Sequence, residues 1–146
     1  LGHNLLVAPL VVSREGALAG LEAYRSAARE DLINLSININ IPVYVTEDDT
    51  KAKNGYKFTV DNYLSTLQQN RSNAASRAAN LDYETVYADY AAIGTPEQVV
   101  SKLKFFQQIF DPQEFMGWFN IGGMLPNDEV ANSMRLFAEK VIPQFK

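Results

Sequence analysis

The sequence contains no cysteine and only one histidine among its 146 residues. The absence of cysteine excludes disulfides and any metal site with thiolate ligands, and it removes any sign of an oxidising compartment. His3 stands alone near the amino terminus, so neither a Ser/His/Asp triad nor a cluster of metal ligands can be assembled. We expect His3 to be structural or solvated, and we assign no catalytic residue and no metal ligand.

Long hydrophobic runs and an excess of positive charge are also missing. The longest apolar run, 5–12, is too short to span a bilayer, and no charged-then-apolar signal peptide precedes it. The net charge is -4, which gives no electrostatic bias toward nucleic acid or an anionic membrane. With 47% hydrophobic and 21% charged residues, the profile is that of an ordinary folded domain, and the cytoplasm is the default location.

The sequence lacks a recognisable phosphate-binding loop as well. No P-loop occurs, and Gly122-Gly123 does not fit the G-x-G-x-x-G spacing of dinucleotide-binding folds. The acidic run Glu47, Asp48 and Asp49 can be imagined as a metal site. Acidic residues are favourable at the start of a helix, and we prefer that interpretation of the run.

The stretch 93–146 carries the clearest structural signals. Thr95 and Gln98 form a T-x-x-Q capping box around Pro96, which suits the first position of a helix. Pro112 ends this helix, because the residue before a proline is disfavoured in the α region. The expected apolar stripe of the helix consists of Val99, Val100, Leu103, Phe106, Ile109 and Phe110.

A strand, a glycine-rich loop and a last helix complete this stretch. Residues 114–121 form an apolar run of strand length, which Gly122-Gly123 interrupts. Asn127 is a suitable cap for the last helix, and Pro143 is expected to stop it. The expected inner face of that helix consists of Val130, Met134, Phe137 and Val141.

The amino-terminal part predicts another strand and helix. Residues 5–9 are continuously apolar, as in a strand buried on both faces, and Ser13 is expected to cap the next helix. Asn54-Gly55 predicts a turn before a further helix, whereas 71–81, rich in alanine and asparagine, gives little signal. The expected stripes of the two helices are Ala17, Leu18, Leu21, Tyr24, Ala28 and Leu32, and Tyr56, Val60, Tyr63, Leu64 and Leu67.

Between these helices, 33–46 alternates apolar and polar residues with period two. One interpretation is a strand with one side in water, as in an antiparallel sheet. In a barrel, the apolar residues would instead pack on outer helices and the polar ones would face the interior. Pro42 cannot donate to a ladder, so we expect the regular strand to begin near it, and Thr46 to cap the following helix.

Three separated motifs resemble the C-terminal end of the luciferase-like flavin monooxygenases, in the order and spacing of that family. G-T-P-E-Q-V starts at Gly94, F-M-G-W-F-N-I-G-G at Phe115, and S-M-R-L-F-A-E-K-V-I-P at Ser133. The segment A-P-L-V-V-S-R-E-G-A-L-A-G-L-E-A-Y-R, from Ala8, is similar to the same family. The resemblance therefore covers both ends of the chain.

This resemblance implies an α/β fold, namely the C-terminal part of a (β/α)8 TIM barrel with its last three strands and their helices. A complete barrel typically needs about 250 residues and at least about 200. Residues 1–146 are therefore interpreted as a single partial domain, the C-terminal portion of an incomplete barrel. The sequence does not open with Met, so Leu1 need not be a natural start.

The resemblance also implies a monooxygenase that uses reduced FMN, supplied by a partner reductase, and O2 to oxygenate a small organic substrate. The family's phosphate loop and reactive-edge residues come from earlier strands, so catalytic residues are expected upstream of Leu1 and this segment alone is expected to be inactive. One alternative is a relative that uses the deazaflavin F420 for hydride transfer. Another is a non-catalytic short α/β protein that binds a ligand or partner. We expect a homo-oligomer.

Trp118 and Asn120 are the candidate cofactor-binding residues. Active sites of (β/α)8 enzymes lie at the carboxyl ends of the strands, and both residues lie near the end of the last one. They share a parity with Met116 and are expected to face the barrel mouth, where an indole and an amide suit a flavin ring. The alternative is that Trp118 is core and Asn120 a turn residue. The opposite parity, expected to pack on helices, holds Phe115, Phe119 and Ile121.

Overall fold

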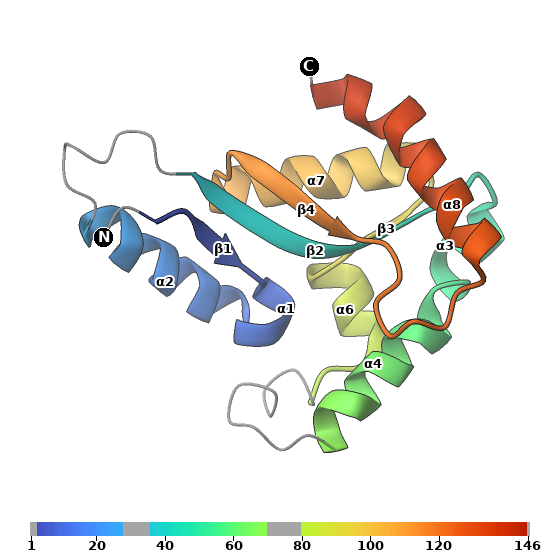
Figure 1. Cartoon of the computed structure of the whole chain (residues 1–146), viewed down its shortest axis with the longest axis horizontal. Coiled ribbons are helices and arrows are strands. Elements are labelled where there is room, and N and C mark those ends of the chain that lie inside the picture. The colour runs from blue at the N-terminus through green and yellow to red at the C-terminus, as the bar shows by residue number, and fades with distance from the viewer. Residues whose placement is uncertain (1–2, 28–35, 70–79, 146) are drawn as a thin grey trace.

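The computed structural model of the chain describes residues 3–27, 36–69 and 80–145. These residues form an open parallel sheet with helices packed on both of its faces (Figure 1). The predicted α/β class is therefore confirmed, and the sheet does not close into a barrel within the described segments. No helix in these segments is long and apolar enough to cross a bilayer.

The second strand lies at the centre of the sheet. It pairs in parallel with β1 through 37–39, with β4 through 38–42 and with β3 through 43–45. Strand β3 has only three residues and was not expected from the sequence. The strands are β1 (Leu5–Val7), β2 (Ile37–Val45), β3 (Ala92–Gly94) and β4 (Glu114–Trp118).

The apolar residues of β2 face one layer of helices. They pack against Leu21 of α2 and against Leu103 and Phe106 of α7, and all of them are buried. Burial of each such side chain contributes about 1.5–3 kcal/mol. The apolar parity of the alternating pattern therefore contacts helices, and the strand lies in a parallel sheet and not in an antiparallel one. This layer contains α2 (Arg14–Ala27), α7 (Pro96–Phe110), α8 (Asn127–Leu136), the π-helical turn η2 (Phe137–Val141) and the 3-10 turn η3 (Ile142–Phe145). The short helix α1 (Pro9–Val12) instead buries Leu10 in a second core.

A second core covers the other side only near the carboxyl ends of the strands. Tyr44 of β2 stacks on Tyr56 with ring centroids 5.2 Å apart, and Ile93 and Ile121 are buried in the same cluster. The helices of the segment between β2 and β3 supply this cover, and in Figure 1 they lie below the sheet and at its right-hand end. They are α3 (Asp49–Asn54), α4 (Lys57–Gln69) and α6 (Tyr83–Asp89).

Several local predictions are confirmed. The capping box of Thr95 and Gln98 is formed at the start of α7, with Pro96 at the first turn. That helix ends at Phe110, and Asp111 takes a left-handed conformation with φ 46°. The Ser13 hydroxyl accepts a hydrogen bond from the Gly16 N–H at 3.2 Å, as expected of a cap. Of the expected inner stripe of α2, Ala28 and Leu32 lie outside the described residues.

Other boundaries differ from the predictions. Strand β2 runs through Pro42 instead of beginning near it. The β1 pairing ends at Ile39 and the β3 pairing begins at Val43, so neither of these ladders needs an N–H from the proline. The cap of α3 is Asp48 and not Thr46, because the Asp48 carboxylate reaches the N–H groups of two residues in the first turn.

The last strand and last helix also differ. Strand β4 stops at Trp118, three residues earlier than expected, because the chain turns there into the loop 119–125. Helix α8 has Pro126 at its cap position, with no side-chain hydrogen bond, so Asn127 is its first residue and not its cap. Met134, expected to face inward, is 51% exposed. The buried Ser133 takes the inner position and accepts a hydrogen bond from the Val45 N–H at 2.8 Å.

Helix α4 holds the loop 119–125 through a set of hydrogen bonds. The Thr59 hydroxyl donates to the Ile121 carbonyl and accepts from the Met124 N–H. The Asn62 amide donates to the Gly122 carbonyl at 2.9 Å. The approach is close enough that a Cβ at Gly122 would lie 2.1 Å from the Thr59 carbonyl oxygen. Only glycine fits at this position.

The two loop glycines allow a matched test of this contact. Gly122 and Gly123 both have positive φ, 80° and 71°, but a Cβ at Gly123 meets nothing within 4 Å. We expect Gly123→Ala to lower the free energy of unfolding by about 1–2 kcal/mol, the cost of a left-handed alanine. Gly122→Ala should lower it further, because α4 must move and loop hydrogen bonds are lost. Urea unfolding of the intact protein measures both; equal losses would contradict the close contact.

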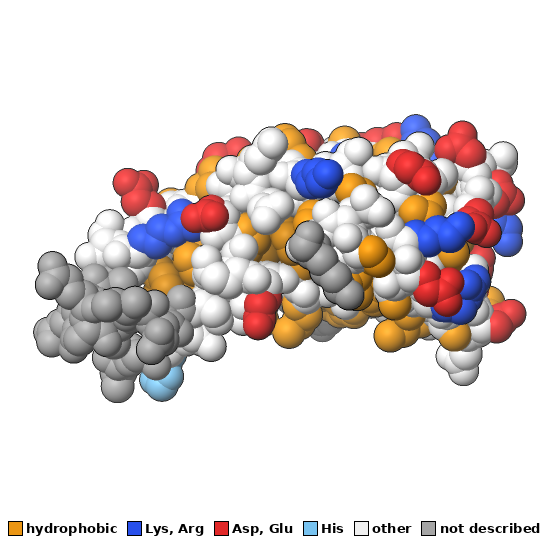
Figure 2. All heavy atoms as spheres, turned by 90° about the horizontal axis from the view of Figure 1, so that it is seen from above, with side chains coloured by type: hydrophobic (Ala, Val, Ile, Leu, Met, Phe, Trp, Pro, Cys, Tyr) orange, Lys and Arg blue, Asp and Glu red, His pale blue; other side chains and the backbone are white. Residues whose placement is uncertain are grey.

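The open edges and exposed apolar side chains predict self-association of the isolated chain. Leu6, Met116 and Trp118 are 51%, 50% and 40% exposed. Figure 2 shows hydrophobic side chains across the middle of one face, with charged side chains gathered at one end. Unpaired strands and apolar patches of this kind favour association. We expect oligomers or aggregates in light scattering after size-exclusion chromatography, and a sharp monomer peak at micromolar concentration with cooperative unfolding would contradict this.

Candidate functional site

The strand register places five side chains on one uncovered face of the sheet. Leu6 of β1 is the register partner of Asn38, Asn40 pairs with Met116, and Trp118 follows at the carboxyl end of β4. We call these five residues the open face. Three of them expose large apolar surface, which a folded protein normally buries or uses for binding. The open face is therefore the first candidate for a functional surface.

The two asparagines of the open face have few partners. The Asn40 amide donates to the Met116 sulfur at 3.2 Å, a weak contact. The Asn38 side-chain oxygen is buried and has no hydrogen-bond partner among the described residues. An unsatisfied buried acceptor costs about 1–3 kcal/mol. A donor from a bound molecule or from another segment would remove that cost.

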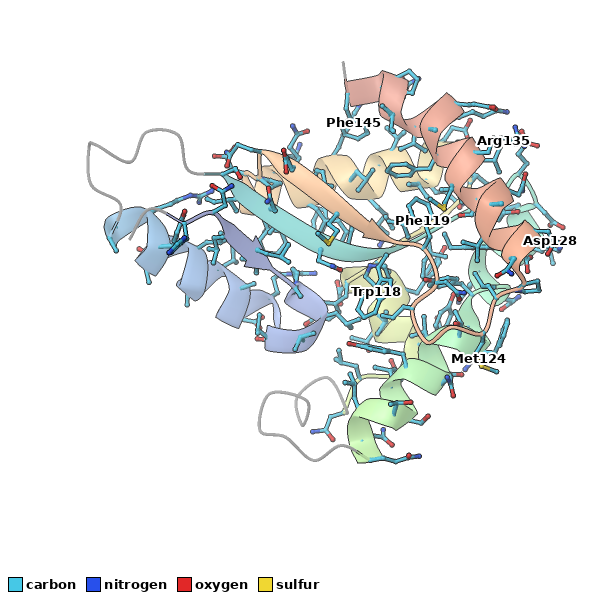
Figure 3. All side chains as sticks on the ribbon, in the orientation of Figure 1. Trp118, Phe119, Met124, Asp128, Arg135 and Phe145 are labelled. Carbon is cyan, nitrogen blue, oxygen red and sulfur yellow. The ribbon has the colours of Figure 1, made fainter. Side chains whose placement is uncertain are left out.

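Trp118 lies at the carboxyl end of β4, next to α4 (Figure 3). Its indole packs edge to face against Tyr63, with ring centroids 5.3 Å apart and an interplanar angle of 72°. Burial raises the pKa of Tyr63, so this phenol stays neutral at physiological pH. The backbone at Trp118 is held by the Tyr56 hydroxyl, which donates to its carbonyl at 3.1 Å. Tyr63 of α4 and Tyr56, which immediately precedes that helix, thus fix the position of the indole.

Asn120 lies in the loop after β4, where strand parity no longer applies. Its side-chain oxygen accepts from the Leu125 N–H at 3.1 Å, and its amide nitrogen donates to the Leu125 carbonyl at 3.5 Å. These bonds close the loop. Of the residues expected on the opposite parity, Phe115 and Phe119 pack on the outer helices, but Ile121 belongs to the second core. The parity pattern therefore holds only as far as Phe119.

A polar pocket of about 390 Å³ lies at the carboxyl end of β2. The Tyr44 hydroxyl donates to the Glu129 carboxylate at 3.1 Å, and the Lys51 ammonium lies 3.7 Å from the same carboxylate. Burial, with the charge of Glu129, raises the pKa of Tyr44 to about 12. Asp128 and Glu129 occupy the first turn of α8, so acidic side chains already complement its helix dipole. This pocket repels a phosphate group.

The other residues considered from the sequence are His3 and the acidic run 47–49. His3 is exposed, and its carbonyl accepts a hydrogen bond from Tyr24. The acidic run 47–49 lies at the start of α3, as preferred from the sequence. Within the described segments, no three acidic or histidine side chains come together in a way that would hold a metal ion. From the sequence, Tyr63 was expected only in an apolar stripe, because periodicity does not show which distant side chain a residue contacts.

Comparisons of the whole fold find similar solved structures. The monooxygenase RslO1 from Streptomyces bottropensis is 24% identical, with a TM-score of 0.72 over 99% of this chain and 43% of that one. The coenzyme F420-dependent tetrahydromethanopterin reductase from Methanopyrus kandleri is 19% identical, with a TM-score of 0.60 over 99% and 46%. The oxygenating constituent of 3,6-diketocamphane monooxygenase from Pseudomonas putida, in complex with FMN, is 15% identical, with a TM-score of 0.61 over 95% and 41%.

No protein-family model matches the chain, and the search of curated proteins finds no match. The chain spans less than half the length of these solved structures. At such identities the similarity shows a shared fold, and it confirms at that level the resemblance found in the sequence motifs. The chain therefore has an α/β fold that matches part of the fold of these solved structures.

Proposed function

We propose that the chain is the C-terminal portion of a luciferase-like flavin-dependent monooxygenase and that the open face forms one wall of its flavin cavity. The observation that carries the proposal is the position of Trp118. Its half-exposed indole stands at the carboxyl end of a parallel strand, beside an uncovered polar and apolar face. Barrel enzymes place their active sites at this end of the strands. The similar solved structures include one in complex with FMN.

The residues present suit the ring of a flavin better than its phosphate. Trp118 offers an aromatic surface, and the amides of Asn38 and Asn40 offer hydrogen bonds to polar ring edges. Leu6 and Met116 would exclude water beside the ring. The acidic pocket at the end of β2, by contrast, repels a phosphate. The phosphate-binding residues would therefore come from the rest of the barrel.

The reaction would be divided between cofactor and protein. Reduced FMN, supplied by a separate reductase, provides the electrons for oxygenation of a small organic substrate. The residues of this chain hold the flavin ring and shield it from water, and Tyr63 packs edge to face against the Trp118 indole. Asn120, which the sequence also indicated as a cofactor-binding residue, lies in the loop after β4. Its side chain would contact the flavin ring through the hydrogen-bonding capacity that its bonds to Leu125 do not use.

A second candidate is an F420-dependent oxidoreductase of the same fold. The F420-dependent reductase and the FMN-complexed monooxygenase match this chain equally well, with TM-scores of 0.60 and 0.61. Dissociation constants of the intact protein for FMN and F420 separate the two candidates. Tight binding of F420 with weak binding of FMN would replace the first proposal by the second.

Binding of FMN to the isolated chain tests whether the phosphate-binding residues lie outside it. We expect residues 1–146 to bind FMN only weakly and to show no oxygenase activity, because the described segments offer no phosphate cradle. Titration calorimetry measures the affinity. A dissociation constant in the micromolar range or below would show that the phosphate site has been misplaced.

The gene upstream of Leu1 provides a separate check, since a reading frame that continues into further barrel strands supports a partial barrel.

Substitution of Trp118 and Asn120 in the intact protein tests whether these two residues contact the flavin. Loss of the Asn120 amide should weaken flavin binding by about 1–3 kcal/mol if the amide contacts the ring. Trp118→Ala should weaken flavin binding as well, whereas a purely structural tryptophan predicts a loss of about 3–5 kcal/mol in folding stability with or without flavin. Thermal unfolding with and without saturating FMN, together with the dissociation constants, separates these results. Unchanged flavin affinity and turnover in both variants would make both residues structural.

A further inference from the structure

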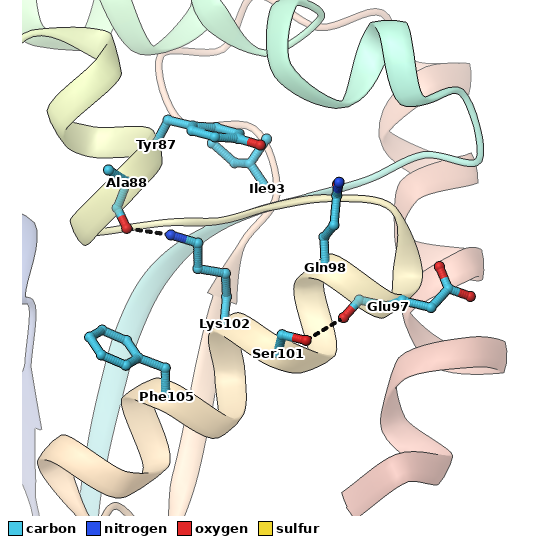
Figure 4. A pocket seen from close by; sticks show the side chains of 8 residues that line it. All are labelled: Tyr87, Ala88, Ile93, Glu97, Gln98, Ser101, Lys102 and Phe105. Atoms are coloured by element: carbon cyan, nitrogen blue, oxygen red, sulfur yellow. Dashed lines mark hydrogen bonds between the residues drawn. The ribbon is translucent and has the colours of Figure 1, made fainter.

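A second pocket lies away from the open face, between α6 and α7. Its volume is about 520 Å³, within the usual range for small-molecule sites (Figure 4). Tyr87 of α6 and Phe105 of α7 line it, together with Ile93 of β3, which is fully buried beside Tyr87. None of these residues belongs to the open face. The pocket is therefore a separate candidate for binding.

Lys102 lies between the two aromatic rings (Figure 4). Its ammonium donates to the Ala88 carbonyl at the end of α6 and lies 5.9 Å from the centroid of the Tyr87 ring. The ion pairs found among the described residues include none with Lys102. An ammonium group has three N–H donors, so two remain for other acceptors. A half-buried cation with only a neutral partner favours an anionic ligand.

The surrounding charges strengthen this preference. The Arg14 guanidinium lies 5.6 Å from the centroid of the Phe105 ring and forms an ion pair with Asp89 at 2.9 Å. Two cations and one carboxylate therefore meet at this end of the pocket. Partial burial lowers the pKa of Lys102, which a bound anion would reverse. Glu97 lies at the other end, with its carboxylate directed away from Lys102 (Figure 4).

We propose that this pocket binds a small aromatic carboxylate. The ligand ring packs against Tyr87 and Phe105, where aromatic contacts and apolar burial stabilise it. The carboxylate accepts charge-assisted hydrogen bonds from Lys102. The Ser101 hydroxyl, which now donates to the Glu97 carbonyl, lines the same pocket and accepts a hydrogen bond from a ring substituent. This site is independent of the proposed flavin cavity.

The test uses 4-hydroxybenzoate as the probe and 4-hydroxybenzamide as its neutral analogue. Saturation-transfer NMR measures their dissociation constants for the wild type, for Lys102→Gln and for Lys104→Gln, an exposed lysine two residues along α7. We expect Lys102→Gln to weaken the carboxylate roughly ten- to hundredfold, as loss of a charged hydrogen bond implies. Lys104→Gln should leave it unchanged, and the neutral amide should not distinguish the three proteins.

Two further measurements keep the result specific to this pocket. Phe105→Ala, which removes a partly exposed side chain, should weaken both probes, while an unchanged melting temperature confirms that the variant folds. Addition of FMN should not displace the carboxylate, whether or not FMN binds elsewhere. The proposal is overturned if the wild type does not bind the probe at millimolar concentration, if Lys102→Gln and Lys104→Gln behave alike, or if FMN displaces the probe.

Discussion

The burial of β2 is the constraint on which the other elements depend. Every strand pairing in the described sheet involves this strand, and its apolar residues form the floor of the outer core. A slip of one residue would turn Asn38 and Asn40 into that core and expose the isoleucines beside them. The register is therefore strongly fixed. It determines which residues of β1 and β4 share a face, and so which side chains make up the open face.

The segment between β2 and β3 has two structural roles. Its helices α4 and α6 cover the second core, and α4 also holds the loop after β4 through Thr59 and Asn62. Tyr56 joins these roles, since its ring stacks on Tyr44 while its hydroxyl donates to the Trp118 carbonyl before that loop and accepts from the Ile121 N–H within it. The position of Trp118 thus depends on a helix more than fifty residues earlier in the sequence.

The two candidate binding surfaces differ in chemistry as well as in place. The open face is neutral, combining amides with apolar and indole surface, and it suits a flat ring with polar edges. The pocket between α6 and α7 has a lysine with a neutral partner beside two aromatic rings, and it suits an anion. The unsatisfied oxygen of Asn38 distinguishes the open face further, because it marks a surface that the described residues do not complete.

Features that depend on neighbours in the sequence were determined by the sequence alone. The capping box at Thr95, the end of α7 before Pro112 and the apolar parity of β2 follow from short-range sterics, hydrogen bonding and periodicity. The motifs likewise indicated the barrel-like fold that the solved structures share. The candidate site was predicted only in part, since parity indicated the face of the sheet on which Trp118 lies but not its contact with Tyr63.

Tertiary structure decided the features that join distant residues. Strand β4 ends at Trp118 because α4 holds the next residues in a loop, and Asn120 therefore bonds to Leu125 instead of continuing the strand. Ser133 replaces Met134 on the inner side of α8 because its hydroxyl meets the end of β2. Periodicity cannot predict such contacts, because it describes one element at a time, whereas these positions depend on which side chains two elements bring together.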